Sequence, residues 1–197
     1  MCLDRCAVGA ALGIASSRLL AAPEPPILQA VTRGRAIPMT CVGVLVALSL
    51  ARTMAVWAEL PEVMASHFGP SGRPDGWQSK AAFFGLYVAI SVFTLWSLLL
   101  VAQLLRIIPV QSINIPHRDY WLVPERRDEA VRMLTHSMDW LAVALAVVLA
   151  GALELVIRAN LARMPLDNTL MVVLLASYLV FQIAWLIHLY RRFKPAP

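Results

Sequence analysis

Four apolar runs, each long enough to cross a lipid bilayer, constrain this chain more than any other feature of its sequence. A spanning helix needs about 20 mostly apolar residues, because about 30 Å of hydrocarbon is crossed at 1.5 Å of rise per residue. Backbone polar groups cannot stay unpaired in lipid, so each run must be helical. The sequence predicts an all-α fold, a polytopic four-helix transmembrane bundle. We expect its helices at about residues 38–58, 81–105, 137–158 and 169–190.

The composition excludes several classes of protein. Hydrophobic residues make up 59% and charged residues 15% of the 197 residues, whereas soluble domains average about 45–50% and about 25%. An ordinary soluble enzyme and a disordered chain are both disfavoured. The three cysteines, Cys2, Cys6 and Cys41, show no C-x-x-C spacing, which disfavours a disulfide framework or a zinc site. We expect no cofactor and no metal.

The distribution of basic residues predicts the orientation. Twelve Lys and Arg residues lie before the first run, between the second and third, and after the fourth, whereas four lie in the other two connections. Because positive charge accumulates on the cytoplasmic side, we expect both termini and the loop 109–135 to be cytoplasmic and the loop 59–80 to be outside. The net charge is +5, and the basic residues lie between the apolar runs, where they can bind the head groups of anionic lipids. We therefore expect the lipid bilayer as a partner. We expect no nucleic acid, because no nucleic-acid-binding motif is present in the sequence.

The sequence divides into a flexible N-terminal extension, residues 1–36, and a membrane domain, residues 37–194. The proline-rich stretch 23–26 favours a flexible segment. The alternative is a weak signal-like segment, because residues 7–17 are apolar and a faint cleavage-like site follows at residues 20–22.

Two opposite charges lie inside the apolar runs. Arg52 and Glu154 each lie about 14 residues into helices that enter from the same side, so both reach a depth of about 21 Å. Intramembrane charges tend to pair within the bundle, which predicts an interhelical ion pair. The alternatives are a pair between Glu154 and Arg158 along one helix and snorkelling of Arg52 to the head groups. Small residues at four-residue spacing predict close packing of the same two helices: Gly43, Ala47, Ala51 and Ala55 on the first, and Ala142, Ala146 and Ala150 on the third.

The two long loops carry turn and helix signals. In loop 59–80, Pro61 suits the start of a short amphipathic helix, with Leu60, Val63, Met64 and Phe68 on one face. The same loop holds a turn signal at residues 74–76 and Ser79, which can cap the second helix. In loop 109–135, Pro124 suits the start of a third helix that begins outside the lipid.

Two motifs in these loops resemble a known family. The run LPEVMASHFGPSGRPDGWQSK, residues 60–80, is similar to the domain of unknown function 1648 of SdpI-like bacterial integral membrane proteins, and NIPHRDYWLVPERR, residues 114–127, resembles its companion motif. The outer-loop positions are Leu60, Pro61, His67, Phe68, Gly72, Pro74, Asp75, Gly76, Ser79 and Lys80. The cytoplasmic positions are Asn114, Pro116, His117, Asp119, Tyr120, Trp121, Glu125 and Arg126.

The resemblance implies a protein of the bacterial inner membrane with no established reaction. We expect a non-catalytic sensing, immunity or interaction protein, whose loops 59–80 and 109–135 recognise a protein or peptide partner, with homo-oligomerisation left open. One alternative is a small transporter with Arg52 and Glu154 in its pathway. Another is a membrane metalloenzyme, using His67 and Asp75 on one side or three residues on the other: His117, Asp119 and Glu125.

Overall fold

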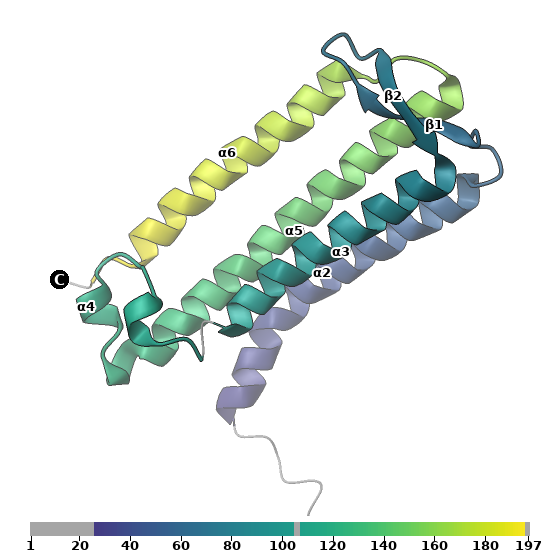
Figure 1. The fold of residues 1–197 in the computed structure, drawn as a ribbon. Helices are drawn as coiled ribbons and strands as arrows, with labels where there is room; N and C mark the ends of the chain where they lie inside the picture. The colour runs from purple at the N-terminus through teal and green to yellow at the C-terminus, as the bar shows by residue number, and fades with distance from the viewer. Residues whose placement is uncertain (1–25, 105–106, 196–197) are drawn as a thin grey trace, which may run out of the picture. The chain divides into compact units, whose positions relative to one another are not determined.

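The computed structural model describes residues 26–104 and 107–195 and contains four long helices (Figure 1). These are α2 (Pro26–Val56), α3 (Lys80–Leu104), α5 (Pro124–Ala162) and α6 (Asn168–Arg192). Each includes a segment long and apolar enough to cross a membrane. The prediction of a polytopic helical membrane protein is confirmed.

The chain divides into two compact units, Met1–Gly34 and Arg35–Pro197. All of the packing described below lies within the second unit. The predicted N-terminal extension, residues 1–36, falls mainly outside the described residues, as does the whole of the signal-like segment. α2 begins at Pro26, well before the predicted start at residue 38. It contains Pro38, whose ring nitrogen donates no hydrogen bond; membrane helices tolerate such a proline because neighbouring groups satisfy the freed carbonyl.

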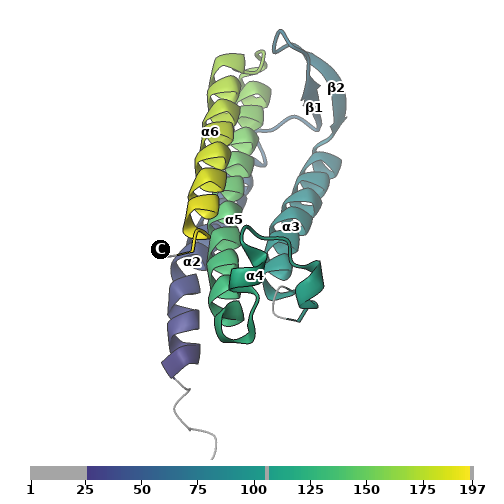
Figure 2. The same ribbon diagram turned by 90° about the vertical axis from the view of Figure 1, so that its left-hand side faces the viewer.

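α5 is the central helix of the second unit. α3 and α6 both pack against it, and in both ribbon views α6 runs along one flank of α5 while α3 lies on another (Figures 1 and 2). Ala142 and Ala146 of α5 are buried together with Val42 of α2 and Leu95 of α3. The predicted small-residue face of α5 is therefore a packing face, because alanine lets neighbouring helices approach closely.

The corresponding prediction for α2 is wrong. Gly43, Ala47, Ala51 and Ala55 are all exposed, and nothing lies within 4 Å of a Cβ added at Gly43. The buried α2 positions are Pro38, Val42, Thr53 and Val56, which lie on the opposite side of the helix from the small-residue stripe. The stripe faces away from α5 because Arg35 and Arg52, on the other side of α2, form ion pairs with residues of α5.

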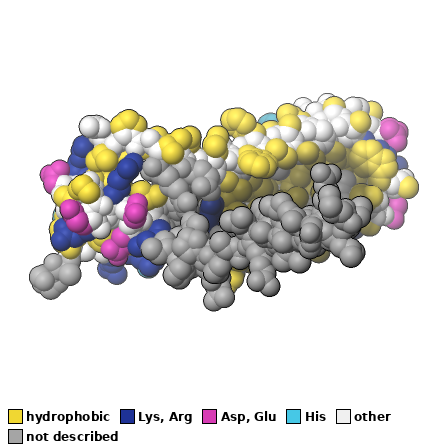
Figure 3. All heavy atoms as spheres, turned by 90° about the horizontal axis from the view of Figure 1, so that it is seen from below, with side chains coloured by type: hydrophobic (Ala, Val, Ile, Leu, Met, Phe, Trp, Pro, Cys, Tyr) yellow, Lys and Arg dark blue, Asp and Glu magenta, His cyan; other side chains and the backbone are white. Residues whose placement is uncertain are grey.

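Polar groups gather at the two ends of the second unit. Figure 3 shows Lys, Arg, Asp and Glu side chains concentrated toward both ends and hydrophobic side chains between them. α5 has 39 residues, about 58 Å at 1.5 Å per residue, so it extends beyond a bilayer core of about 30 Å. It begins with Pro124 at its first turn, as the sequence predicts.

Loop 59–80 forms a β-hairpin rather than the predicted amphipathic helix. β1 (Val63–Phe68) pairs with β2 (Pro74–Ser79) in antiparallel register, with Val63 opposite Ser79 and irregularities on either side of His67. The turn residues decide the outcome: Gly72 has a φ of 75°, which allows the chain to reverse direction. The apolar residues that suggested one helix face are divided between a buried Met64 and an exposed Val63. We call this end of the unit the hairpin end.

The opposite end, which we call the α4 end, is built from loop 109–135. It contains a 3₁₀ turn η1 (Val110–Ser112) and the short helix α4 (Arg118–Trp121). Ile113, Ile115 and Trp121 form a buried cluster with Leu134 of α5 and Phe193, which follows α6. The loop is therefore folded against α5 and the end of α6.

Substitution of Gly72 by alanine tests the hairpin geometry. A Cβ at this position would lie 2.5 Å from the Leu166 carbonyl oxygen, and the positive φ is itself unfavourable for alanine. We expect Gly72→Ala to lower the free energy of unfolding by about 1–3 kcal/mol, measured by equilibrium unfolding from mild detergent into SDS. The control is Gly85→Ala in α3, where the added Cβ meets nothing within 4 Å. Equal stability of the two variants would contradict this geometry.

Candidate functional site

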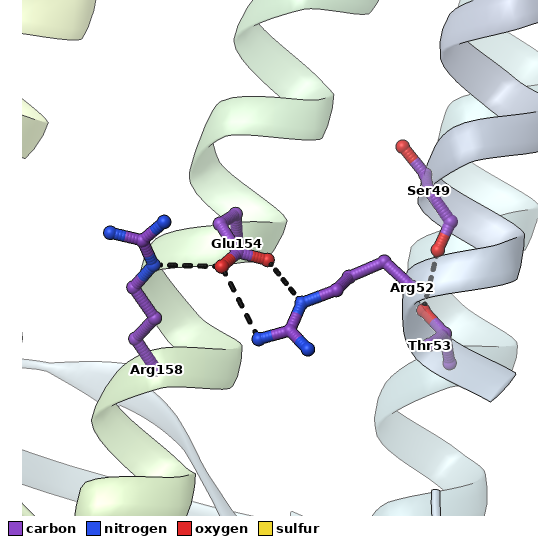
Figure 4. A network of polar contacts seen from close by, with 5 residues as sticks. All are labelled: Ser49, Arg52, Thr53, Glu154 and Arg158. Atoms are coloured by element: carbon purple, nitrogen blue, oxygen red, sulfur yellow. Dashed lines mark hydrogen bonds and ion pairs between the residues drawn. The ribbon is translucent and has the colours of Figure 1, made fainter. Parts of the chain in front are cut away.

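The structure brings Arg52 of α2 and Glu154 of α5 into direct contact. Arg52 Nε donates to Glu154 Oε2 at 2.9 Å, and Arg52 Nη2 donates to Oε1 at 3.4 Å. Arg158, one turn further along α5, donates from Nε to Glu154 Oε1 at 2.7 Å. Figure 4 shows the Glu154 carboxylate between the two guanidinium groups. The interhelical pair and the alternative pair along α5 are both present.

This network is suited to holding helices together. Both oxygens of Glu154 accept hydrogen bonds from guanidinium groups, which stay protonated at any physiological pH. The Thr53 hydroxyl is bonded to the Ser49 carbonyl oxygen of its own helix at 2.9 Å and adds no link to the network. Glu154 therefore anchors α2 to α5, and each of its two oxygens accepts from a guanidinium group.

A second ion pair joins the same two helices closer to the α4 end. Arg35 Nε and Nη2 donate to the two carboxylate oxygens of Asp139 at 2.7 and 2.8 Å, and the Asp139 side chain is fully buried. This pair was missed because Arg35 was counted with the residues preceding the first apolar run. The spacing in the sequence indicates this pair, because Arg35 precedes Arg52 by 17 residues and Asp139 precedes Glu154 by a similar 15 residues.

At the hairpin end, Lys80 holds the end of α2. Its ammonium donates to the carbonyl oxygens of Trp57 at 2.9 Å and Leu60 at 3.2 Å, lies 2.9 Å from a carboxylate oxygen of Glu62, and is 5.0 Å from the centre of the Trp57 ring. Carbonyls at a helix C-terminus lack intrahelical partners and favour a nearby cation. Lys80 is a buried structural residue that fixes the hairpin to α2.

The connection between α5 and α6 holds the hairpin from the other side. Asn160 Oδ1 accepts from the Ala65 backbone N–H at 2.7 Å, and its Nδ2 donates to the Ala65 carbonyl oxygen at 3.0 Å. The Leu166 N–H donates to the Gly72 carbonyl oxygen at 2.8 Å. Asn168 Nδ2 donates to the Pro70 carbonyl oxygen at 2.6 Å. Sequence reasoning missed both asparagines, although an Asn at the end of an apolar run is a detectable signal.

Four other outer-motif residues shape the hairpin. Phe68 packs onto the cluster formed by Leu155, Ala159 and Leu166 and is paired in register with Pro74. A Cβ on Gly76 would lie 2.9 Å from the His67 Cβ, so only glycine fits opposite His67. Ser79 Oγ accepts from the Ala82 N–H at 3.2 Å at the start of α3.

His67, Asp75 and Ser79 are the outer-motif residues exposed to solvent, and His67 and Asp75 take no part in the attachments of the hairpin described above. Their side chains contact each other across the hairpin through Nδ1 and Oδ1 and are 76% and 52% exposed. Two apolar residues of the hairpin are also exposed: Val63 and Trp77. Beside them is a cavity of about 350 Å³, whose lining includes Pro61, Pro74, Trp77, Arg163 and Met164. The hairpin therefore presents polar and apolar groups together on an anchored strand pair.

At the α4 end, two aromatic residues of the cytoplasmic motif have structural partners. Trp121 Nε1 donates to the Phe193 carbonyl oxygen at 2.7 Å. Arg126 lies 4.0 Å from the centre of the Tyr120 ring. His117 precedes α4 with a φ of 54°. Pro116 is half-buried, and the remaining motif residues are exposed: Asn114, His117, Asp119 and Glu125.

The residues considered for a metal do not form a ligand set. His67 and Asp75 lie at the hairpin end, whereas His117, Asp119 and Glu125 lie at the α4 end. Within residues 26–104 and 107–195, no three His, Cys, Asp or Glu side chains are grouped so that they could hold a metal ion.

One segment of this chain is similar to a known family. Residues 44–90 match the family model described as Domain of unknown function (DUF1648), which confirms the resemblance carried by the outer-loop motif. The matched segment runs from α2 through the hairpin into α3 and includes Arg52 and Lys80. No curated protein and no solved structure matches the chain.

Loss of the Asp139 charge tests the buried pair. Asp139→Asn leaves the Arg35 guanidinium without its counter-ion, and breaking a buried pair in this way costs about 3–5 kcal/mol. We expect a loss of that order in the free energy of unfolding in detergent, with part of it restored by adding Arg35→Gln. The control is Asp128→Asn, an exposed position on the same helix, with an effect within about 0.5 kcal/mol. Equal effects at positions 139 and 128 would refute the buried pair.

Proposed function

We propose that this integral membrane protein is a non-catalytic recognition protein of the bacterial inner membrane, which binds a protein or peptide partner through its β-hairpin. In this proposal the hairpin end faces outward and both termini are cytoplasmic, following the distribution of basic residues. The observation that carries the proposal is the hairpin itself. It is fixed to both α2 and α5, yet exposes a group of residues that serve none of these attachments: Val63, His67, Asp75 and Trp77.

The hydrogen bonds that hold the hairpin favour binding, because they fix the conformation of its backbone in the absence of a partner. A preorganised segment loses less conformational entropy on association than a mobile loop. Exposed Trp and Val side chains, 59% and 61% accessible here, gain when a partner covers them, and tryptophan is enriched among residues that dominate binding energy. The adjoining cavity adds Arg163, a cation suited to a carboxylate or a carbonyl oxygen.

The same geometry gives less support to a transporter. A pathway through Arg52 and Glu154 would need groups free to bind and release a solute, whereas the Glu154 carboxylate is occupied by two guanidinium groups. The cavity between α2 and α3, about 340 Å³, is lined mainly by aliphatic residues, with Ser49, Tyr87 and Ser91 as polar members.

Photocrosslinking in native membranes tests the proposal. A benzophenone amino acid replaces Trp77 in the full chain, and in a control variant it replaces Phe93, which is 77% exposed on the apolar helix α3. We expect a protein adduct of one defined mass from position 77 only. Adding His67→Ala and Asp75→Ala should reduce that adduct at least about fivefold without lowering the amount of chain in the membrane, since those side chains are exposed.

Lipid adducts alone from both positions would contradict the proposal, because they would show that Trp77 contacts only the bilayer. An adduct unaffected by the His67 and Asp75 substitutions would remove the motif pair from the binding surface.

A further inference from the structure

A concave basic surface lies at the α4 end, on the opposite end of the unit from the hairpin. It has a volume of about 760 Å³ and is bounded by α4, the first turns of α5 and the end of α6. Four cationic side chains line it, against the single carboxylate of Glu129. The cations are Arg126, Arg132, Arg192 and Lys194.

Most of this positive charge is not neutralised by the protein. Among the residues that the structure describes, Arg132, Arg192 and Lys194 form no ion pair with a carboxylate. All three are exposed. Like charges placed around one hollow repel each other, and an anion that enters the hollow removes this repulsion. The charge of this surface is therefore suited to a negatively charged group.

The walls of the hollow are fixed by contacts that do not use Arg132, Arg192 or Lys194. Trp121 is bonded to the Phe193 carbonyl oxygen and packs edge-on against the Phe193 ring, which is fully buried. Arg126 is held over the Tyr120 ring. The end of α6 is thereby fastened to α4, and Arg192 and Lys194 are kept opposite Arg132.

The position along the helices indicates the source of the anion. Trp185 Nε1 of α6 donates to the Ser137 carbonyl oxygen of α5 at 3.1 Å, which sets the level of one helix against the other. Trp140 and Tyr190, exposed by 39% and 54%, lie within about one and a half turns of this level, as aromatic residues do at a membrane interface. Arg132 and Arg192 lie beyond them, at the ends of the apolar segments, where lipid head groups are found.

We propose that this basic hollow binds the phosphate of an anionic phospholipid head group. Guanidinium groups match phosphate oxygens with paired N–H donors, and basic pockets at the ends of membrane helices are suited to anionic lipid. Met133 and Trp121 supply apolar walls beside the charges. The assignment is independent of the function proposed for the hairpin, because no residue is shared between the two surfaces.

Lipid binding by the purified full chain tests this assignment. Native mass spectrometry from detergent measures retention of short-chain phosphatidylglycerol, of phosphatidylcholine, and of inorganic phosphate at equal concentration. We expect phosphatidylglycerol to be retained in preference to the other two. Arg132→Gln combined with Arg192→Gln should weaken its binding about tenfold or more.

The control removes the same charge from two exposed positions that do not line the hollow, with Arg73→Gln and Arg118→Gln, and should bind phosphatidylglycerol as the wild type does. Thermal unfolding of both double variants verifies that they are folded, as expected for exposed positions. Equal loss in the two double variants would overturn the proposal, because the effect would then be one of net charge. Inorganic phosphate bound as tightly as phosphatidylglycerol would also overturn it, by showing that the site takes a soluble anion. Competition by an acidic peptide at lower concentration than the lipid would do the same.

Discussion

Pairing of charge within the apolar helices is the constraint from which the rest of this structure follows. A charged side chain within an apolar helix is costly unless it has a partner of opposite charge. Two arginines of α2 pair with two carboxylates of α5: Arg35 with Asp139 and Arg52 with Glu154. The two pairs are separated by about 26 Å along α2 and about 23 Å along α5 at 1.5 Å per residue. Two attachments at similar spacing require the helices to run in the same direction and determine which face of α2 meets α5. They also explain why the small-residue stripe of α2 faces outward.

This alignment positions the hairpin. The turn that follows α2 supplies the carbonyl groups that Lys80 binds, and α5 supplies Asn160, whose amide holds the backbone of Ala65. If α2 and α5 shifted relative to each other, the two attachments could not both be satisfied. The geometry of the proposed recognition surface therefore depends on the ion pairs that join α2 to α5.

The sequence was sufficient for the architecture and for part of the site, and the reasons differ between elements. Length and hydropathy decide a membrane helix almost alone, so the four helices were predictable. The equal depth of Arg52 and Glu154 was predictable because every residue of an α-helix adds the same rise along the helix axis. The amphipathic reading of residues 60–68 failed because apolar spacing over so few residues does not distinguish a helix from a strand, and the turn at Gly72 decides the outcome. Asp139 and Asn160 were missed because their partners, Arg35 and the backbone of Ala65, are about a hundred residues away in the chain.

The double-mutant cycle on Arg52 and Glu154 tests the central claim most directly. It compares the free energies of unfolding of Arg52→Gln, Glu154→Gln, the combined variant and the wild type, all measured from mild detergent into SDS, with Arg158→Gln as a reference for the contact along α5. If the interhelical pair joins α2 to α5, the double variant loses less than the sum of the single losses by about 1 kcal/mol or more, and Arg158→Gln costs about 0.5 kcal/mol or less. Additive losses, with a coupling energy of zero, would contradict the claim that this pair holds the two helices together.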